Sequence, residues 1–136
     1  MIGLDTNVLV RQIVQDDEDQ AALAGELIED RCTAASPGHI PLIVLCELVW
    51  VLNSAYRYSR SQITLALRQV LVTDCFDVEQ HALAWGALAD YAGRNVDYAD
   101  CVIARLNRDS GSHTTFTFDK KAARLERFTL LNNRSL

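Results

Sequence analysis

The 136-residue chain has little of what marks several common protein classes. It contains only four cysteines, and no two of them are close enough for a CxxC motif or a zinc-finger spacing. We therefore expect Cys32, Cys46, Cys75 and Cys101 to be reduced and mostly buried thiols. The chain also lacks repeats, low-complexity tracts and Pro/Gly-rich linkers, so we expect a single domain over residues 1–136.

Long apolar runs are also missing. The longest, residues 40–52, is interrupted by Pro41 and Glu47 and is too short to cross a bilayer. The amino terminus, MIGLDTN, has neither the basic start nor the apolar centre of a signal peptide. The sequence therefore predicts a soluble, cytoplasmic protein with no membrane contact.

Excess basic charge is absent as well, since the formal net charge is -5. A protein that only binds nucleic acid usually carries a basic face, whereas clustered carboxylates that hold cations fit an acidic chain better. The Walker, GxGxxG, GxSxG and HExxH motifs do not occur. We interpret the scattered His39, His81 and His113 as structural or surface residues.

Strand-like and helix-like segments alternate along the chain. Apolar runs and β-branched residues predict strands at residues 1–4, 39–43, 73–78, 113–118 and 128–131. Helical spacing and caps predict helices at residues 7–12, 19–31, 44–58, 61–72, 79–92, 96–108 and 119–126. This alternation favours an α/β fold with a parallel sheet covered on both faces.

Some expectations concern single side chains in these elements. Asp16 and Asp17, and Ser59 or Ser61, are candidate helix caps. We expect Trp50 and Trp85 in the core or at an interface. In the helix at residues 96–108 we expect three side chains to point inward: Val102, Ile103 and Leu106.

Acidic residues stand where strands end and helices begin. Asp5 closes the first strand, Asp119 closes the fourth, and Asp100 lies in the first turn of a helix. Ligands of open parallel sheets bind outside the carboxyl ends of the strands. Glu47 lies in an otherwise uncharged apolar stretch, where a carboxylate is costly unless it is paired, protonated or bound to a metal. Asp97 lies one helical turn before Asp100.

Oxygen ligands of this kind suit Mg²⁺ or Mn²⁺, and one or two such ions can support displacement at phosphorus. The acids therefore indicate a metal-dependent phosphodiester hydrolase. A purely structural interpretation stays open for each acid taken singly, because Asp is a favoured helix cap and Glu47 can pair with a buried Arg.

Four motifs together resemble the PIN-domain family, and most of all the VapC-type toxins of bacterial toxin–antitoxin pairs. They are LDTNVLVR at residues 4–11, VLCELVWVL at 44–52, DYADCVIA at 97–104 and TFTFDKKAARL at 115–125. The resemblance implies a three-layer α/β/α sandwich with a central, mostly parallel sheet. It also implies a Mg²⁺- or Mn²⁺-dependent endoribonuclease that forms a homodimer and is inhibited by a small VapB-type antitoxin.

Carried over by position, the resemblance assigns catalytic and metal-binding roles to Asp5, Glu47, Asp100 and Asp119, with Asp97 as an additional metal-binding acid. It places Thr6 and Thr117 at polar positions near the metal site, and Asn7 is a further candidate for a supporting polar residue. Three arginines are candidate phosphate contacts or, equally, solvated surface residues: Arg11, Arg57 and Arg60. In the expected mechanism a water made acidic by the metal attacks the RNA phosphodiester in line.

Other functions remain open at this point. A phosphoaspartate hydrolase would have an acid where Asn7 stands, and a receiver domain would need a different placement of its lysine than Lys120 or Lys121 offers. A non-catalytic module could use the same acidic pocket to bind a basic partner peptide. A solitary RNA-processing nuclease is the remaining alternative.

Overall fold

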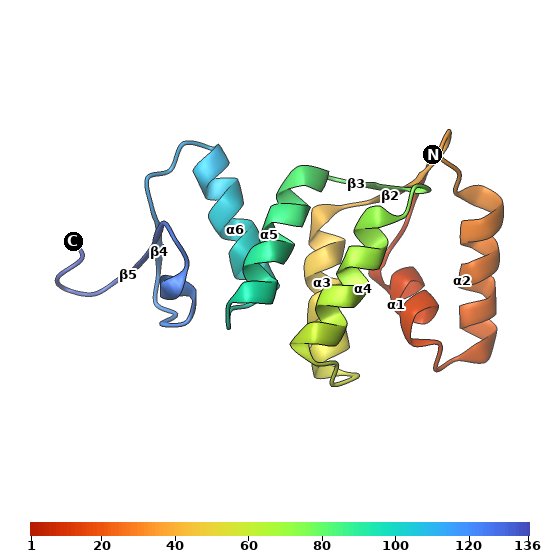
Figure 1. Cartoon of the computed structure of the whole chain (residues 1–136), viewed down its shortest axis with the longest axis horizontal. Coiled ribbons are helices and arrows are strands. Elements are labelled where there is room, and N and C mark those ends of the chain that lie inside the picture. Colours follow the sequence, from red (N-terminus) through yellow and green to blue (C-terminus); the bar gives the residue numbers. More distant parts are fainter. The chain divides into compact units, whose positions relative to one another are not determined.

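The computed structural model describes residues 1–136 and divides them into two units, Met1–Ala84 and Trp85–Leu136. Each unit has its own parallel strands, which Figure 1 labels along the chain. None of the helices has the length and apolar content that a membrane crossing requires.

A three-stranded parallel sheet organises the first unit. Its strands are β1 (Ile2–Gly3), β2 (Gly38–Ile40) and β3 (Phe76–Val78), and they lie in the order β1-β2-β3. Gly38 is the register partner of both Ile2 and Phe76. Parallel neighbours cannot be joined by a hairpin, so each connection crosses over through helices. The first crossover contains α1 (Thr6–Val14) and α2 (Glu18–Arg31), and the second contains α3 (Leu42–Ser54) and α4 (Arg60–Val72) (Figure 1).

The core of the first unit depends on α3 and α4. Leu45, Leu48 and Leu52 fall on one stripe of α3, and all three are fully buried. Ile63 and Leu67 of α4 are fully buried as well. Burying a side chain of this size contributes roughly 1.5–3 kcal/mol. These helices are therefore held by packing.

Side-chain caps fix the starts of α2 and α4. Asp17 caps α2 by accepting a hydrogen bond from the amide of Gln20 at 3.0 Å. Ser59 caps α4 in a reciprocal arrangement with Gln62, in which each side chain accepts from the other residue's amide. Of the candidate caps in the sequence, Asp17 and Ser59 are thus the ones used.

Residues 85–136 contain most of α5 (His81–Gly93), all of α6 (Tyr98–Asp109) and a pair of parallel strands, β4 (Thr115–Thr117) and β5 (Phe128–Leu130). The short 3₁₀ helix η1 (Ala122–Arg124) lies in the crossover between the two strands. Tyr91 of α5 and Tyr98 meet edge to face, with ring centroids 6.0 Å apart.

The predicted α/β class with parallel strands is confirmed, and each predicted strand is found close to its expected position. The predicted helix at residues 119–126 is wrong in extent, because only η1 forms there. The prediction that Ile103 and Leu106 point inward is also wrong, since they are 43% and 37% exposed. The buried stripe of α6 runs through Tyr98, Cys101 and Val102, and the next residue faces away from it.

Two further expectations are settled by burial. Trp50 is 70% exposed, so it does not belong to the core, and its role at an interface stays a prediction. No disulfide joins the cysteines: Cys32 and Cys101 are buried, and Cys46 and Cys75 are partly buried. Burial raises the pKa of the Cys32 and Cys46 thiols, which keeps them protonated.

Candidate active site

Asp5 lies where β1 ends and α1 begins. The amide of Leu4 still donates to the carbonyl of His39 at 2.8 Å, which continues the β1–β2 pairing up to Asp5. The Asp5 side chain then accepts a hydrogen bond from the amide of Thr6 at 2.7 Å and caps α1. Asp5 is therefore a helix cap that also stands at the carboxyl end of a strand. Its carboxylate is exposed.

Glu47 is tied to the same region by one hydrogen bond. The hydroxyl of Thr6, a residue only 5% exposed, donates to Oε1 of Glu47 at 3.2 Å. The expectation that Glu47 lies in apolar surroundings is wrong, because its side chain is exposed. Helix α3 buries the stripe through Leu45 and Leu48, and it turns Glu47 outward between the exposed Ile43 and Trp50. The partner of the Glu47 carboxylate is thus a hydroxyl and not a buried Arg.

The second unit holds the other three predicted site acids. Asp97 is the N-cap residue of α6, and Asp100 lies in the first helical turn. Burial raises the pKa of Asp100, and the negative charges of Asp97 and Asp119 raise it further. The three carboxylates therefore share one local field, in which Asp97 and Asp119 disfavour the ionisation of Asp100. A cation in this field would reverse that effect.

Asp119 follows β4 closely. Its carboxylate accepts hydrogen bonds from the amides of Lys121 and Ala122 at 2.8 and 3.3 Å, and its own amide donates to Oγ1 of Thr117 at 3.0 Å. These bonds close a turn at the end of the strand. Thr117 thus fixes the backbone at Asp119, and its role near a metal ion stays a prediction.

The donor chemistry of these residues fits a hard divalent cation, since every one of them offers carboxylate oxygens. Neither unit by itself gathers three or more His, Cys, Asp or Glu side chains in an arrangement that could hold a metal ion. Asp5 and Glu47 belong to the first unit, and Asp97, Asp100 and Asp119 belong to the second, so their roles toward a metal ion stay predictions.

Of the candidate phosphate contacts, Arg11 is already engaged. Its guanidinium donates to Gln20, to Asp16 at 3.2 Å and to the Tyr56 hydroxyl at 3.1 Å. The bond to Tyr56 is the largest cause that raises the pKa of Arg11. Tyr56 donates in turn to Asp16 at 3.0 Å, so Arg11 belongs to a network that ties α1 to the start of α2.

The remaining predicted polar residues lie at helix ends. Arg57 has a positive φ of 55° just after α3, and Arg60 is the first residue of α4. Asn7 is exposed in the first turn of α1. Their roles toward a substrate stay predictions.

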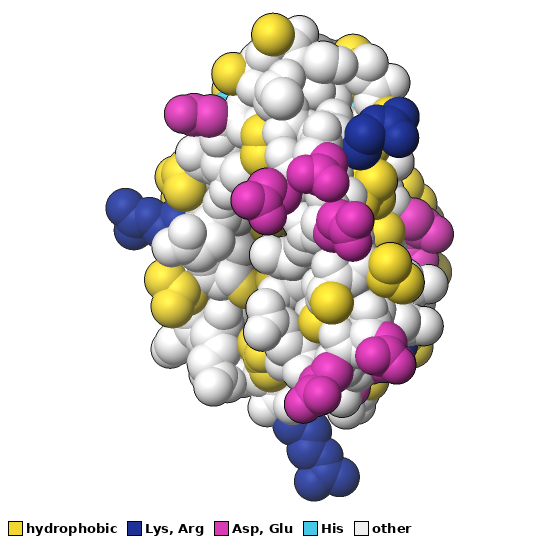
Figure 2. Space-filling view, turned by 90° about the vertical axis from the view of Figure 1, so that its right-hand side faces the viewer, with side chains coloured by type: hydrophobic (Ala, Val, Ile, Leu, Met, Phe, Trp, Pro, Cys, Tyr) yellow, Lys and Arg dark blue, Asp and Glu magenta, His cyan; other side chains and the backbone are white.

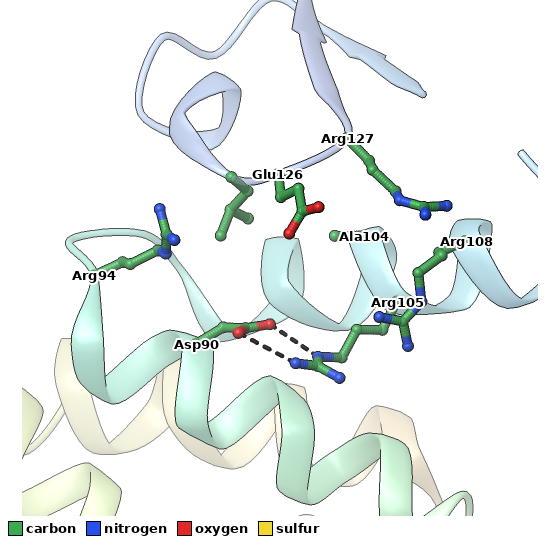
Figure 3. A pocket seen from close by; sticks show the side chains of 8 residues that line it. Asp90, Arg94, Ala104, Arg105, Arg108, Glu126 and Arg127 are labelled. Atoms are coloured by element: carbon green, nitrogen blue, oxygen red, sulfur yellow. Dashed lines mark hydrogen bonds and ion pairs between the residues drawn. The ribbon is translucent and has the colours of Figure 1, made fainter. Parts of the chain in front are cut away.

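The sequence does not predict a cluster of basic side chains that the structure forms in the second unit. Figure 3 shows it as a cavity lined by four arginines: Arg94, Arg105, Arg108 and Arg127. The spacing of Arg105 and Arg108, three residues apart on one helix, was the available signal. Arg94 and Arg127 are distant from that pair in the sequence, so no spacing pattern connects them to it.

A model of the PIN domain matches residues 2–128, so the chain belongs to the PIN-domain family. It is also similar to a VapC ribonuclease of Aquifex aeolicus (strain VF5), with 23% identity over 122 residues, which is 90% of each chain. The family match includes all five predicted acids and runs across both units, from Asp5 to Asp119.

Proposed function

We propose that the chain is a divalent-metal-dependent endoribonuclease that hydrolyses phosphodiester bonds in RNA, and that it is the toxin of a VapBC-type toxin–antitoxin pair. The observation that carries this proposal is membership of the PIN-domain family over residues 2–128, with every predicted acid inside the match. The similarity to a VapC ribonuclease supports both RNA as the substrate and the toxin role.

In this proposal Asp5, Glu47, Asp100 and Asp119 are the catalytic acids that hold Mg²⁺ or Mn²⁺, and Asp97 assists them. The ion, when bound, supplies Lewis acidity and a more acidic water for attack on phosphorus. The chain supplies the orientation. Thr6 holds Glu47 through its hydroxyl and Asp5 through its amide. Thr117 accepts from the amide of Asp119, and the mutual repulsion around Asp100 favours a cation there.

Partners and location belong to the same proposal. A small VapB-type antitoxin, a homodimer and a cytoplasmic site of action are what a VapC-type toxin would require. They rest on the resemblance of the four sequence motifs and on the name of the Aquifex relative.

The proposal is tested with purified, antitoxin-free protein and a fluorescent single-stranded RNA in the presence of Mn²⁺. We expect cleavage that stops when EDTA removes the metal. Asp5→Asn, Glu47→Gln and Asp100→Asn should each lower the rate on the order of 100-fold or more, because each removes a ligand charge. The matched control is Asp30→Asn, which changes an exposed acid of α2 and should leave the rate unchanged.

Metal-dependent cleavage that survives Asp5→Asn would contradict the assignment of these residues. If the wild-type protein binds an arginine-rich peptide but cleaves no RNA in Mn²⁺, the chain is a non-catalytic module with an acidic binding surface. A gene for a small DNA-binding antitoxin next to the coding sequence separates the toxin from a solitary RNA-processing nuclease.

A further inference from the structure

A cavity of about 130 Å³ lies within residues 85–136. Figure 3 shows where its charged side chains come from: Arg94 follows α5, Arg105 and Arg108 lie on α6, and Arg127 precedes β5. The full lining consists of four arginines, two acids and two apolar residues: Arg94, Arg105, Arg108, Arg127, Asp90, Glu126, Ala104 and Leu125.

One arginine of the cavity is neutralised and fixed. Arg105 donates from Nε to Oδ2 of Asp90 at 2.8 Å and from Nη2 to Oδ1 at 3.2 Å, a two-pronged ion pair (dashed in Figure 3). The guanidinium lies against Gly86 of α5, where a side chain would collide with it. The Asp90–Arg105 pair therefore forms a rigid wall of the cavity that carries no net charge.

The other three arginines keep most of their donors available. Arg94 makes one long bond, 3.4 Å, to the carbonyl of Arg124, and Arg108 reaches its neighbour Asp109 at 3.3 Å. Arg127 is exposed, and its guanidinium has no hydrogen bond or ion pair. A guanidinium has five N–H donors in a fixed fork. Against these three cations stands one unpaired acid, Glu126, so the cavity keeps a positive excess.

The backbone at Arg127 is held in an unfavourable conformation. Its φ is 67°, which lies in the left-handed region of backbone conformations that residues other than glycine rarely adopt. The carbonyl of Arg127 accepts from Thr115 N at 2.7 Å and from Thr114 Oγ1 at 3.0 Å, and these bonds fix the conformation. Local strain of this kind persists where the surroundings impose it, and it often marks binding sites.

The charge of the surrounding chain also favours an anion in this unit. Residues 85–136 contain eight Lys and Arg against six Asp and Glu, a formal charge of +2, whereas residues 1–84 contain five against twelve, a charge of -7. Figure 2 shows more acidic than basic side chains on the side of the molecule that carries α2. An anion is therefore attracted to the second unit and repelled from the face of α2.

We propose that this cavity binds a backbone phosphate of RNA, as an anchoring site formed by residues other than the five acids. The identity of the nucleic acid rests on the proposed function; the preference for a phosphate rests on the cavity. Arginine forks match phosphate oxygens in pairs, and the volume suits one small anionic group. An acidic peptide fits less well, because Ala104 and Leu125 are the only apolar residues of the lining and offer little room for an apolar anchor.

The test measures RNA binding without cleavage. A labelled single-stranded RNA is titrated by fluorescence anisotropy against protein that carries Asp5→Asn, in EDTA and at several salt concentrations. We expect the combined variant Arg94→Gln, Arg108→Gln and Arg127→Gln to bind more weakly. The negative slope of log affinity against log salt should become shallower by about 0.7 for each phosphate that the variant no longer neutralises. Circular dichroism checks that the variant is folded.

The matched control is Arg68→Gln, which removes an exposed arginine from α4 in the first unit and should leave affinity and slope unchanged. Wild-type affinity in the triple variant would overturn the proposal. Displacement of the RNA by poly-glutamate as effectively as by an unlabelled RNA of equal charge would also overturn it, and would assign the cavity to an acidic peptide.

The same variants separate this proposal from the nuclease activity. With Asp5 restored and Mn²⁺ present, the triple variant should raise KM for RNA with little change in kcat, because the cavity contributes binding and not chemistry. If the wild-type protein cleaves nothing, the proposed function fails, and the anisotropy result still decides whether the cavity binds RNA.

Discussion

The hydroxyl of Thr6 donates to Oε1 of Glu47 at 3.2 Å and so connects the first residue of α1 to the middle of α3, 41 positions along the chain. The amide of the same residue donates to Asp5 at 2.7 Å. One nearly buried threonine thus contacts both candidate catalytic acids of the first unit. A carboxylate held by a neighbouring donor keeps its orientation toward a metal ion, and outer groups of this kind strongly affect metal affinity.

Thr6→Val removes this hydroxyl at almost constant volume. We expect Mn²⁺ affinity, measured by titration calorimetry, to fall about 10-fold or more, because Glu47 loses the group that orients it. Thr6→Ser keeps the hydroxyl and should stay close to wild type. Equal metal affinity in the valine and serine variants would show that the hydrogen bond does not contribute to metal binding.

Asp100→Asn should change the pH dependence of stability. Burial, Asp97 and Asp119 raise the pKa of Asp100 in the folded state above its ordinary value of 3.8. The folded chain therefore holds this proton more tightly than the unfolded chain, and the free energy of unfolding falls as the pH rises from 3.8 through the folded-state pKa. At neutral pH without metal the asparagine variant avoids this decrease, and it should be more stable than the wild type.

Urea denaturation in EDTA at neutral pH and below pH 3.8 checks this result, because the gain over the wild type should be larger at neutral pH. Asp30→Asn controls for the general removal of one negative charge. Added Mn²⁺ should stabilise the wild type more than Asp100→Asn, because a ligand that binds only the folded state stabilises the folded state. If the stability gain of Asp100→Asn over the wild type is smaller at neutral pH than at acid pH, the pKa of Asp100 is not raised in the folded state.

Gly86→Ala should fail to stabilise α5, although alanine is the better helix former by about 1 kcal/mol. The new methyl group would collide with the guanidinium of Arg105, which is held by Asp90. Gly93→Ala is the matched control, because nothing lies within 4 Å of its added carbon. In an Arg105→Ala background, Gly86→Ala should stabilise the protein, as measured by urea denaturation. An effect of Gly86→Ala that is the same in both backgrounds would mean that the two residues do not interact.

Ser59→Ala should lower the free energy of unfolding by about 1 kcal/mol, because it removes the N-cap of α4 and breaks the reciprocal bonds with Gln62. Ser61→Ala, at an exposed position within the same helix, should cost little. Thermal or urea denaturation of both variants measures the difference. Equal destabilisation in the two variants would show that the cap is not what holds the start of α4.

Much of the fold was predictable because its signals are local. Short apolar strands alternate with helical spacing, and parallel pairing follows because the crossovers contain helices. Asp17 and Ser59 act as caps for reasons that lie within three residues of each. The segment at residues 119–126 was mispredicted because Asp119 closes a turn with Lys121 and Ala122, and only a 3₁₀ turn follows.

The sequence by itself determined which acids are candidates for metal binding, and all of them lie within the match to the PIN-domain family. Only the tertiary structure decided which way they face. Glu47 lies in an apolar run yet is exposed, because a helix buries one stripe and α3 places Leu45 and Leu48 on it. The cavity around Arg105 was likewise invisible in the sequence, because it joins α5, α6 and the residue before β5. Residue type follows from the chain, whereas the neighbours of a side chain follow from packing between distant segments.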